Sequence, residues 1–194
     1  MKNKFILGLL LVPALLFTSC GEDDAAEAPQ EQTGVIGTWK LRPIEASMAV
    51  GPSAGSAEWW FIPTADVAAR SCQFDDTYTF AEDGTFTIEM NGTTWVEGWQ
   101  GVPDGGCEAP VAPHANGSHT YEFNETAGTL TVNGTGAFIG LAKVNNQGEL
   151  PNVAVPSTIT YSIAEFSGTG SDRTMKLIIE AGSGVFWTFL LEAE

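Results

Sequence analysis

The segment Trp95-Val96-Glu97-Gly98-Trp99 combines residue types that bind carbohydrate. We expect a strand here, so that Trp95, Glu97 and Trp99 share one face. Two indole rings can stack on the apolar C–H faces of a pyranose ring, and a carboxylate between them can accept hydrogen bonds from hydroxyl groups. A carboxylate is costly in a closed core unless it is paired. The pattern favours an open binding face, and packing of both indoles in the core or at a barrel end is an equal alternative.

Further polar and aromatic residues could enlarge this surface. Gln100 directly follows the segment, and the Gly- and Pro-rich loop after it could add polar contacts. Trp59 and Trp60 form a second aromatic pair in an irregular region. They could bind a ligand or cover the mouth of a barrel. Trp39 and Trp187 have alternating apolar neighbours instead, which favours a place in the core.

Local catalytic motifs are missing from the sequence. Glycoside hydrolysis with retention needs two carboxylates roughly 5 Å apart, and the Glu-x-Asp-x-x-Glu run that supplies them on one strand is absent. Asp75 and Asp76 would point to opposite faces of a strand. A Gly-x-Ser-x-Gly elbow, a phosphate loop and a His-Glu-x-x-His motif are also absent, and His114 and His119 alone cannot build a zinc site. We therefore expect a non-enzyme without cofactor or metal.

The N-terminus has the features of a secretory signal peptide. A basic start precedes an apolar run over residues 5–17, which is shorter than the roughly 20 residues of a transmembrane helix. Leu16-Phe17-Thr18-Ser19-Cys20 resembles the bacterial lipobox. The resemblance implies that lipid is attached to Cys20 and that residues 1–19 are removed. An ordinary signal peptide followed by a chance cysteine is the alternative.

Residues 20–33 are rich in Ala, Glu, Gln and Pro and show no apolar period, so we expect a disordered acidic tether. The cluster Gly21-Glu22-Asp23-Asp24 resembles the surface-export signal of Bacteroidetes-type lipoproteins. That resemblance implies a lipid-anchored protein of the cell outer membrane that is exposed at the surface. In an oxidising envelope compartment, Cys72 and Cys107 are expected to form a disulfide.

The mature chain is strongly acidic. Without residues 1–19 it keeps six Lys and Arg against all 24 Asp and Glu, which gives a formal charge of −18. This composition offers no basic patch for phosphate groups, so nucleic acid is excluded as a partner. The same charge repels anionic lipid and acidic polysaccharide, which favours a neutral ligand.

Residues 34–194 show the pattern of one β domain. Short runs with an apolar residue at every second position alternate with turn signals, and no segment has a helical period. We expect an antiparallel barrel or sandwich of about 8–10 strands, because an up-and-down barrel removes free edges. Asn91-Gly92 predicts a hairpin turn. The expected strands are 35–41, 72–80, 85–90, 94–99, 118–123, 129–132, 134–143, 158–164, 174–180 and 185–191.

Two resemblances support this fold class. Gly37-Thr38-Trp39 resembles the Gly-x-Trp signature of lipocalins and of lipocalin-like Bacteroidetes lipoproteins, which implies a Trp packed across the closed end of a barrel. Much of 35–191 is similar to an uncharacterised β module of flavobacterial lipoproteins that accompanies laminarinase-type enzymes of glycoside hydrolase family 16. This similarity implies a place in a polysaccharide-utilisation system. The similar blocks are 72–76, 95–101, 107–114, 134–144 and 156–161.

The sequence therefore predicts a non-catalytic surface lipoprotein that binds a neutral polysaccharide, with a β-glucan as the candidate, for capture or uptake. Its partners would be the glycan, the membrane that holds its lipid anchor and an outer-membrane uptake complex. One alternative is a carrier of a small apolar ligand, which needs an open apolar cavity inside the barrel. The other is a structural subunit of an outer-membrane complex, which needs a broad apolar patch.

Overall fold

The computed structural model describes residues 34–145 and 154–194. The expected signal peptide, the lipid-bearing Cys20 and the tether up to residue 33 lie outside the described residues. The described residues belong to one compact unit. Among them, no helix has the length and apolar character to cross a membrane.

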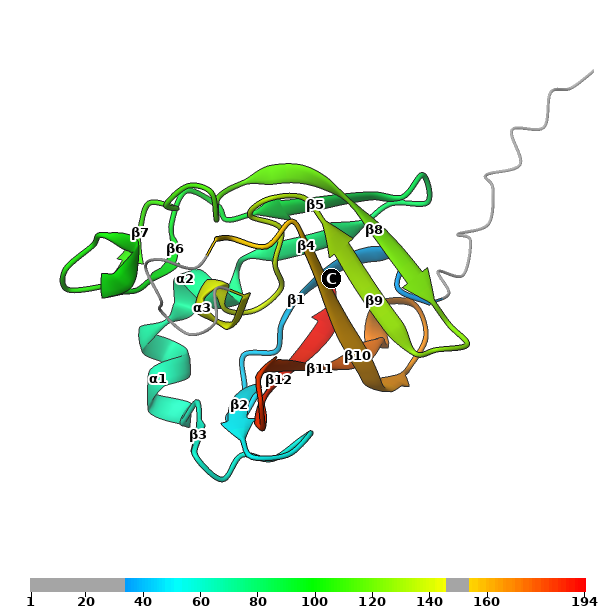
Figure 1. The fold of residues 1–194 in the computed structure, drawn as a ribbon, viewed down its shortest axis with the longest axis horizontal. Helices are drawn as coiled ribbons and strands as arrows, with labels where there is room; N and C mark the ends of the chain where they lie inside the picture. The colour runs from blue at the N-terminus through cyan, green and yellow to red at the C-terminus, as the bar shows by residue number, and fades with distance from the viewer. Residues whose placement is uncertain (1–33, 146–153) are drawn as a thin grey trace, which may run out of the picture. The chain divides into compact units, whose positions relative to one another are not determined.

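Eight antiparallel strands form a closed barrel (Figure 1). Each strand pairs with the next one in the series, and the last pairs back with the first, where Trp39 lies opposite Ala193. The expected all-β antiparallel fold is confirmed as an up-and-down barrel, whose closure leaves its strands without long free edges. The barrel strands are β1 (Gly37–Leu41), β4 (Thr77–Phe80), β5 (Thr85–Glu89), β8 (Gly117–Asn124), β9 (Thr129–Asn133), β10 (Thr158–Ser167), β11 (Thr174–Gly182) and β12 (Val185–Ala193).

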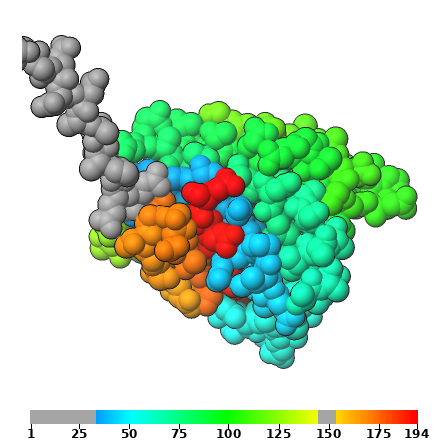
Figure 2. All heavy atoms as spheres, turned by 180° about the vertical axis from the view of Figure 1, so that it is seen from behind, coloured from blue at the N-terminus to red at the C-terminus, as the bar shows by residue number. Residues whose placement is uncertain are grey.

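Strand β12 has two partners along its length on the side of the N-terminal strands. Its residues 191–193 pair with β1, and its residues 186–189 pair with β2 (Met48–Gly51). Figure 2 shows the red atoms of β12 between the blue atoms of the N-terminal strands and the orange atoms of the preceding segment. A short strand, β3 (Trp60–Phe61), pairs with β2, so the barrel wall continues at this end as the β2–β3 pair.

Two short helices connect β3 to β4. They are α1 (Thr64–Ala69) and α2 (Ser71–Phe74). No helix was expected here, and the strand expected over 72–80 begins only at Thr77. In α2 three successive residues, Cys72, Gln73 and Phe74, are buried, so the alternation of Tyr78 and Phe80 does not continue back through this segment.

A hairpin outside the barrel sheet follows β5. It consists of β6 (Thr94–Val96) and β7 (Gly106–Glu108), which pair with each other in a separate two-stranded sheet. Asn91 and Gly92 have the expected positive φ angles of 43° and 88°. The strands on either side of this turn do not pair, because β5 pairs with β4 and β8 instead. The disulfide expected between Cys72 and Cys107 is confirmed, and it joins α2 to β7.

The strand expected over 134–143 is wrong, because residues 137–141 form a buried irregular segment that leads into α3 (Ala142–Asn145). We call residues 137–141 the plug. The Tyr78 hydroxyl accepts a hydrogen bond from Gly140 N–H (3.1 Å), and the Tyr161 hydroxyl accepts one from Ile139 N–H (2.9 Å). These tyrosines belong to β4 and β10, so the plug is fixed to opposite parts of the barrel wall.

The core fills the barrel. Trp39 is fully buried, as expected, and donates its indole N–H to the carbonyl of Val35 at 2.7 Å. Inward residues of the strands pack with the plug into one apolar cluster. Among its fully buried members are Leu41, Phe80, Phe86, Ile88, Leu130, Val132, Ile139, Leu177, Phe189 and Leu191.

Candidate binding pocket

A pocket of about 260 Å³ lies beside the β2–β3 end of the barrel wall. Its walls come from six parts of the chain, namely β2, β3, the residue after α1, the turn after β6, the plug with α3, and β12. Figure 1 shows α1, α2, α3, β6 and β7 on the same side of the barrel. The lining residues are Val50, Trp60, Arg70, Glu97, Leu141, Lys143 and Trp187.

Arg70 lies between two indole rings. Its guanidinium carbon is 4.1 Å from the ring centroid of Trp95 and 5.7 Å from that of Trp60, both within the range of cation–π attraction. Arg70 directly follows α1, and its backbone N–H bonds the carbonyl of Asp66 at 2.9 Å. Burial lowers the pKa of Arg70, and the carboxylates of Asp66 and Glu97 oppose that change. The guanidinium is therefore a cation whose position is set by both rings.

Glu97 stands between a cation and an indole. Its Oε1 accepts a hydrogen bond from Lys143 Nζ at 3.0 Å, and its Oε2 accepts one from the indole N–H of Trp99 at 3.1 Å. Lys143 Nζ also lies 5.7 Å from the ring centroid of Trp187. A charged pair that is about four-fifths buried, at 21 % exposure for each side chain, keeps a defined geometry.

The turn after β6 explains how Glu97 reaches the pocket. The expected strand over 94–99 is wrong beyond Val96, because residues Gly98–Gln100 form a 3₁₀ turn, η1, that Glu97 caps. The side chain of Gln100 accepts the backbone N–H of Glu97 at 3.0 Å. Gln100 therefore holds the turn, and the structure does not place it in the lining of the pocket. Trp95 and Trp99 do not share a strand face for the same reason.

The two indoles that line the pocket do not form a flat surface. The rings of Trp60 and Trp187 have centroids 5.9 Å apart and an angle of 54° between their planes. Trp187 was expected in the core, but it is only partly buried, because it packs on Phe189 on one side and lines the pocket on the other. The aromatic residues are thus walls of a concave site.

Trp59, like Gln100, is an expected ligand-binding residue that the structure leaves outside the pocket. It is 53 % exposed, whereas the adjacent Trp60 is partly buried against the core. The other expected residues, Trp95, Glu97 and Trp99, lie in or directly behind the lining.

Among the charged and aromatic lining residues, three were not expected from the sequence: Arg70, Lys143 and Trp187. One signal could have found two of them, because residues 34–194 contain only six Lys and Arg. In so acidic a chain, a cation in a loop without neighbouring charges of the same sign is a candidate for a specific role. Among the described residues, no group of three or more His, Cys, Asp or Glu is placed to hold a metal ion.

Comparison with known proteins found no matching family model and no matching curated protein. The chain is similar to solved structures from Bacteroides. One is an uncharacterised protein from Bacteroides eggerthii, with a TM-score of 0.37 and 12 % identity over 83 % of this chain and 100 % of that chain. Another is a lipocalin-like protein from Bacteroides uniformis, with a TM-score of 0.38 and 12 % identity over 82 % of this chain and 98 % of that chain.

Proposed function

We propose that this protein is a non-catalytic lipoprotein that binds a neutral glycan in the pocket between Trp60 and Trp187. The observation that carries the proposal is the pairing of indole walls with the Arg70, Glu97 and Lys143 side chains. Indole faces stack on sugar C–H groups, while the cations donate hydrogen bonds and the carboxylate accepts them. A sugar hydroxyl is both donor and acceptor, so this set of groups is complementary to it.

The charges in the pocket also favour a neutral ligand. Lys143 is already paired with Glu97, and Glu97 and Asp66 act electrostatically on Arg70. A ligand with several negative charges would have to enter this site against the −18 charge of the mature chain. Neutral hydroxyl groups need no such compensation.

The shape of the pocket narrows the proposal to a short ligand or a chain end. Its volume of about 260 Å³ is just below the roughly 300–1,000 Å³ of pockets for drug-sized ligands. The indoles of Trp60 and Trp187 are inclined to each other, so a long glycan chain cannot lie flat on both rings. A single sugar unit at the end of a chain fits the concave shape better.

The barrel interior argues against the carrier alternative. A carrier of an apolar ligand needs open space among the inward residues, but these residues pack with the plug into one core. The subunit alternative has one observation in its favour, because Ile44, Trp59 and Phe61 are 40 %, 53 % and 41 % exposed near the β2–β3 pair. Such exposed apolar residues are typical of protein contacts when they form a continuous patch.

The proposed location is the outer membrane, with lipid on Cys20 and the β domain outside the cell, next to an uptake complex for the glycan. The lipobox-like residues 16–20 and the acidic residues after them support it. Metabolic labelling with a fatty acid should mark the wild-type chain and leave Cys20→Ala unmarked. Protease added to whole cells should remove the β domain if it lies at the surface.

Glycan binding is tested by affinity electrophoresis of the chain without residues 1–20 in gels that contain laminarin or other neutral glucans, followed by titration with short oligosaccharides. Trp60→Ala and Trp187→Ala should each weaken binding by about 10- to 30-fold, as expected for a buried aromatic contact. Trp59→Ala is the matched control, because it removes an adjacent indole outside the pocket, and it should leave affinity unchanged.

Two results would reject the proposal. One is the absence of binding to every neutral glucan and oligosaccharide tested. The other is equal weakening by Trp59→Ala and Trp60→Ala, which would move the site to the exposed aromatic residues. Salt separates ligand classes: affinity for a neutral ligand should not change between about 0.1 and 1 M NaCl, although the screening length falls from about 10 to 3 Å.

A further inference from the structure

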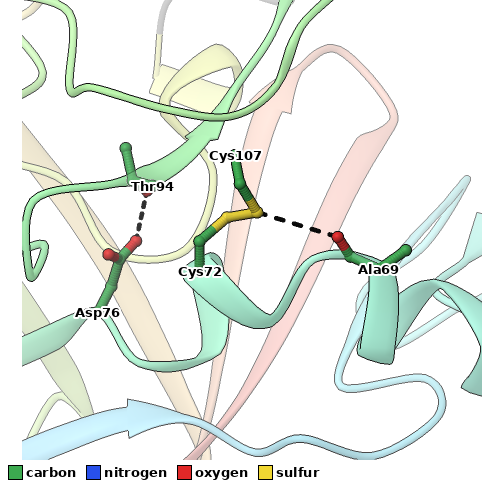
Figure 3. Close-up of a disulfide and its surroundings, with 5 residues drawn as sticks. All are labelled: Ala69, Cys72, Asp76, Thr94 and Cys107. Carbon is green, nitrogen blue, oxygen red and sulfur yellow. Dashed lines mark hydrogen bonds between the residues drawn. A yellow bond between two sulfur atoms is a disulfide. The ribbon is translucent and has the colours of Figure 1, made fainter.

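The disulfide lies next to the pocket in both of the segments that it joins. Cys72 follows Arg70 by two residues, and Cys107 lies directly opposite Trp95 in the β6–β7 register. The bond therefore joins the segment that carries the guanidinium to the hairpin that carries the indole under it. Figure 3 shows this bridge between α2 and the hairpin, with Cys107 Sγ 3.9 Å from the carbonyl oxygen of Ala69, at the end of α1.

Within the hairpin, β7 has fewer attachments to the rest of the fold than β6, whose Thr94 and Val96 are buried. The hairpin lies outside the barrel sheet, and an isolated two-stranded hairpin is only marginally stable in water. At its first residue, the Thr94 hydroxyl donates a hydrogen bond to Asp76 Oδ2 at 2.6 Å (Figure 3). In β7, Cys107 is exposed, and its side chain is linked to α2 through the disulfide. Loss of the bridge therefore frees β7, the strand that pairs with β6 directly opposite Trp95, and removes one of the constraints on the Trp95 ring.

The barrel itself does not depend on the bridge in this way. Its eight strands pair with one another in a closed series, and the hairpin adds no strand to that series. The core cluster lies inside the barrel and is fixed by the strands and the plug. Removal of the disulfide should therefore separate two properties, the folded state of the barrel and the geometry of the pocket.

We propose that Cys72 and Cys107 are positioning residues of the binding site, whose disulfide holds Trp95 against Arg70 so that the complete pocket exists only in the oxidised protein. The effect on glycan affinity rests on the function proposed above. The effect on the hairpin does not, because it concerns the protein without ligand.

The ligand-free arm of the test is amide hydrogen exchange on the unlipidated mature chain. In Cys72→Ser/Cys107→Ser, amides of residues 94–108 should exchange at least about tenfold faster than in wild type, since that region loses its attachment. Amides of β9 and β12 should stay strongly protected relative to the unfolded chain, because the barrel remains folded. Unchanged exchange over 94–108 overturns the proposal, and so does the loss of all protection in β9 and β12.

The glycan arm is a double-mutant cycle with Arg70→Ala and laminarin oligosaccharide as the probe. Arg70→Ala should weaken binding about tenfold in the wild-type background and have almost no further effect in the serine pair, because there Arg70 is already displaced. Equal effects in the two backgrounds would show that the disulfide contributes only general stability, and would overturn the proposal. If the wild type binds no glycan, the proposed function fails, and hydrogen exchange still decides the role of the bridge.

Reduction of the disulfide in the folded wild-type protein tests the same loss of the bridge without a refolding step. Dithiothreitol transfers two electrons and two protons to the Cys72–Cys107 bond, which becomes two thiols, and leaves as its own cyclic disulfide. Faster exchange over 94–108 and weaker glycan binding are expected within the still-folded barrel. A reduced protein with wild-type exchange and affinity would contradict the positioning role even if the serine pair fails to fold.

Discussion

The buried carboxyl group of Asp76 should make the stability of this fold depend on pH. The side chain is 1 % exposed, its Oδ2 accepts the Thr94 hydroxyl, and its Oδ1 has no partner among the described residues. Burial raises the pKa of Asp76 from 3.8 to about 8, the hydrogen bond from Thr94 opposes that shift, and the nearby charge of Asp75 adds to it. The folded protein therefore keeps a proton on this carboxyl at neutral pH, where the unfolded chain has released it.

The sign and size of the change in unfolding free energy with pH follow from this difference in bound protons. Between the two pKa values the folded state binds more protons than the unfolded state, so the free energy of unfolding falls as pH rises. The loss begins above the unfolded pKa and is complete above about 8. Over about 4 pH units, at 1.36 kcal/mol per unit, ionisation of Asp76 lowers the free energy of unfolding by about 5 kcal/mol at alkaline pH. That is a large part of the typical 5–15 kcal/mol for a domain.

The test compares Asp76→Asn with the wild type by denaturant unfolding from about pH 5 to 9. Asn imitates the neutral acid and can still accept the Thr94 hydroxyl, so the two proteins should have similar stability at the acid end. At the alkaline end the variant should be more stable by about 4–5 kcal/mol. Asp75→Asn is the control, because Asp75 is exposed, and it should keep most of the wild-type slope. Parallel curves for wild type and Asp76→Asn would refute the reasoning.

Three further changes test other parts of the fold. Replacing Cys72 and Cys107 by serine removes a bridge across 35 residues, so denaturant unfolding should show a loss of about 3–4 kcal/mol, the value of the chain-entropy model. Tyr161→Phe leaves a buried backbone N–H of the plug without its partner, and a loss of about 1–3 kcal/mol should appear in thermal unfolding. Gly140→Ala should cost more than about 2 kcal/mol in denaturant unfolding, because φ is +87° and the added Cβ would lie 2.4 Å from a ring carbon of a buried phenylalanine of β12.

The barrel strands could be predicted because their two faces differ in environment. In β5, Phe86 and Ile88 point inward and threonines point to solvent, and β9 repeats this pattern with Leu130 and Val132. An alternation of this kind identifies a half-buried strand from local sequence alone. The disulfide was predictable for a different reason, since only two cysteines remain after Cys20 is assigned to lipid.

The wrong predictions fall where a tertiary contact outweighs local alternation. Phe74, Tyr78 and Phe80 alternate as in one strand, but the segment before Asp75 is a helix that buries Gln73, whose side chain donates to the carbonyl of Gly140 at 3.3 Å. That partner lies 67 residues away in the sequence, so no local pattern contains it. The same holds for Glu97, which ends β6 because it caps a turn and pairs with Lys143.

The sequence suggested residue types for a binding site but not the shape of the pocket. Trp95, Glu97 and Trp99 were singled out because two indoles and a carboxylate suit a sugar, and Trp60 as one of a second aromatic pair. In the structure Trp60 and Glu97 line the pocket, while Trp95 and Trp99 contact its charged residues from behind. The flat face expected from alternation is replaced by inclined walls, because Trp187 arrives from the last strand of the barrel. Barrel closure decides which distant segments meet, and the pattern of a single strand carries no information about it.

Within the described residues, the plug links the packed interior of the barrel to the outer pocket. Ile139 packs inside the barrel, Leu141 lines the pocket, and Lys143, two residues later in α3, pairs with Glu97. These three residues belong to five consecutive positions, so the segment that fills the interior also supplies one wall of the site outside it. A barrel opened for an apolar ligand would have to withdraw this segment and would lose the Lys143–Glu97 pair with it. In the described part of the chain, an opened barrel interior and an intact outer pocket would therefore exclude each other.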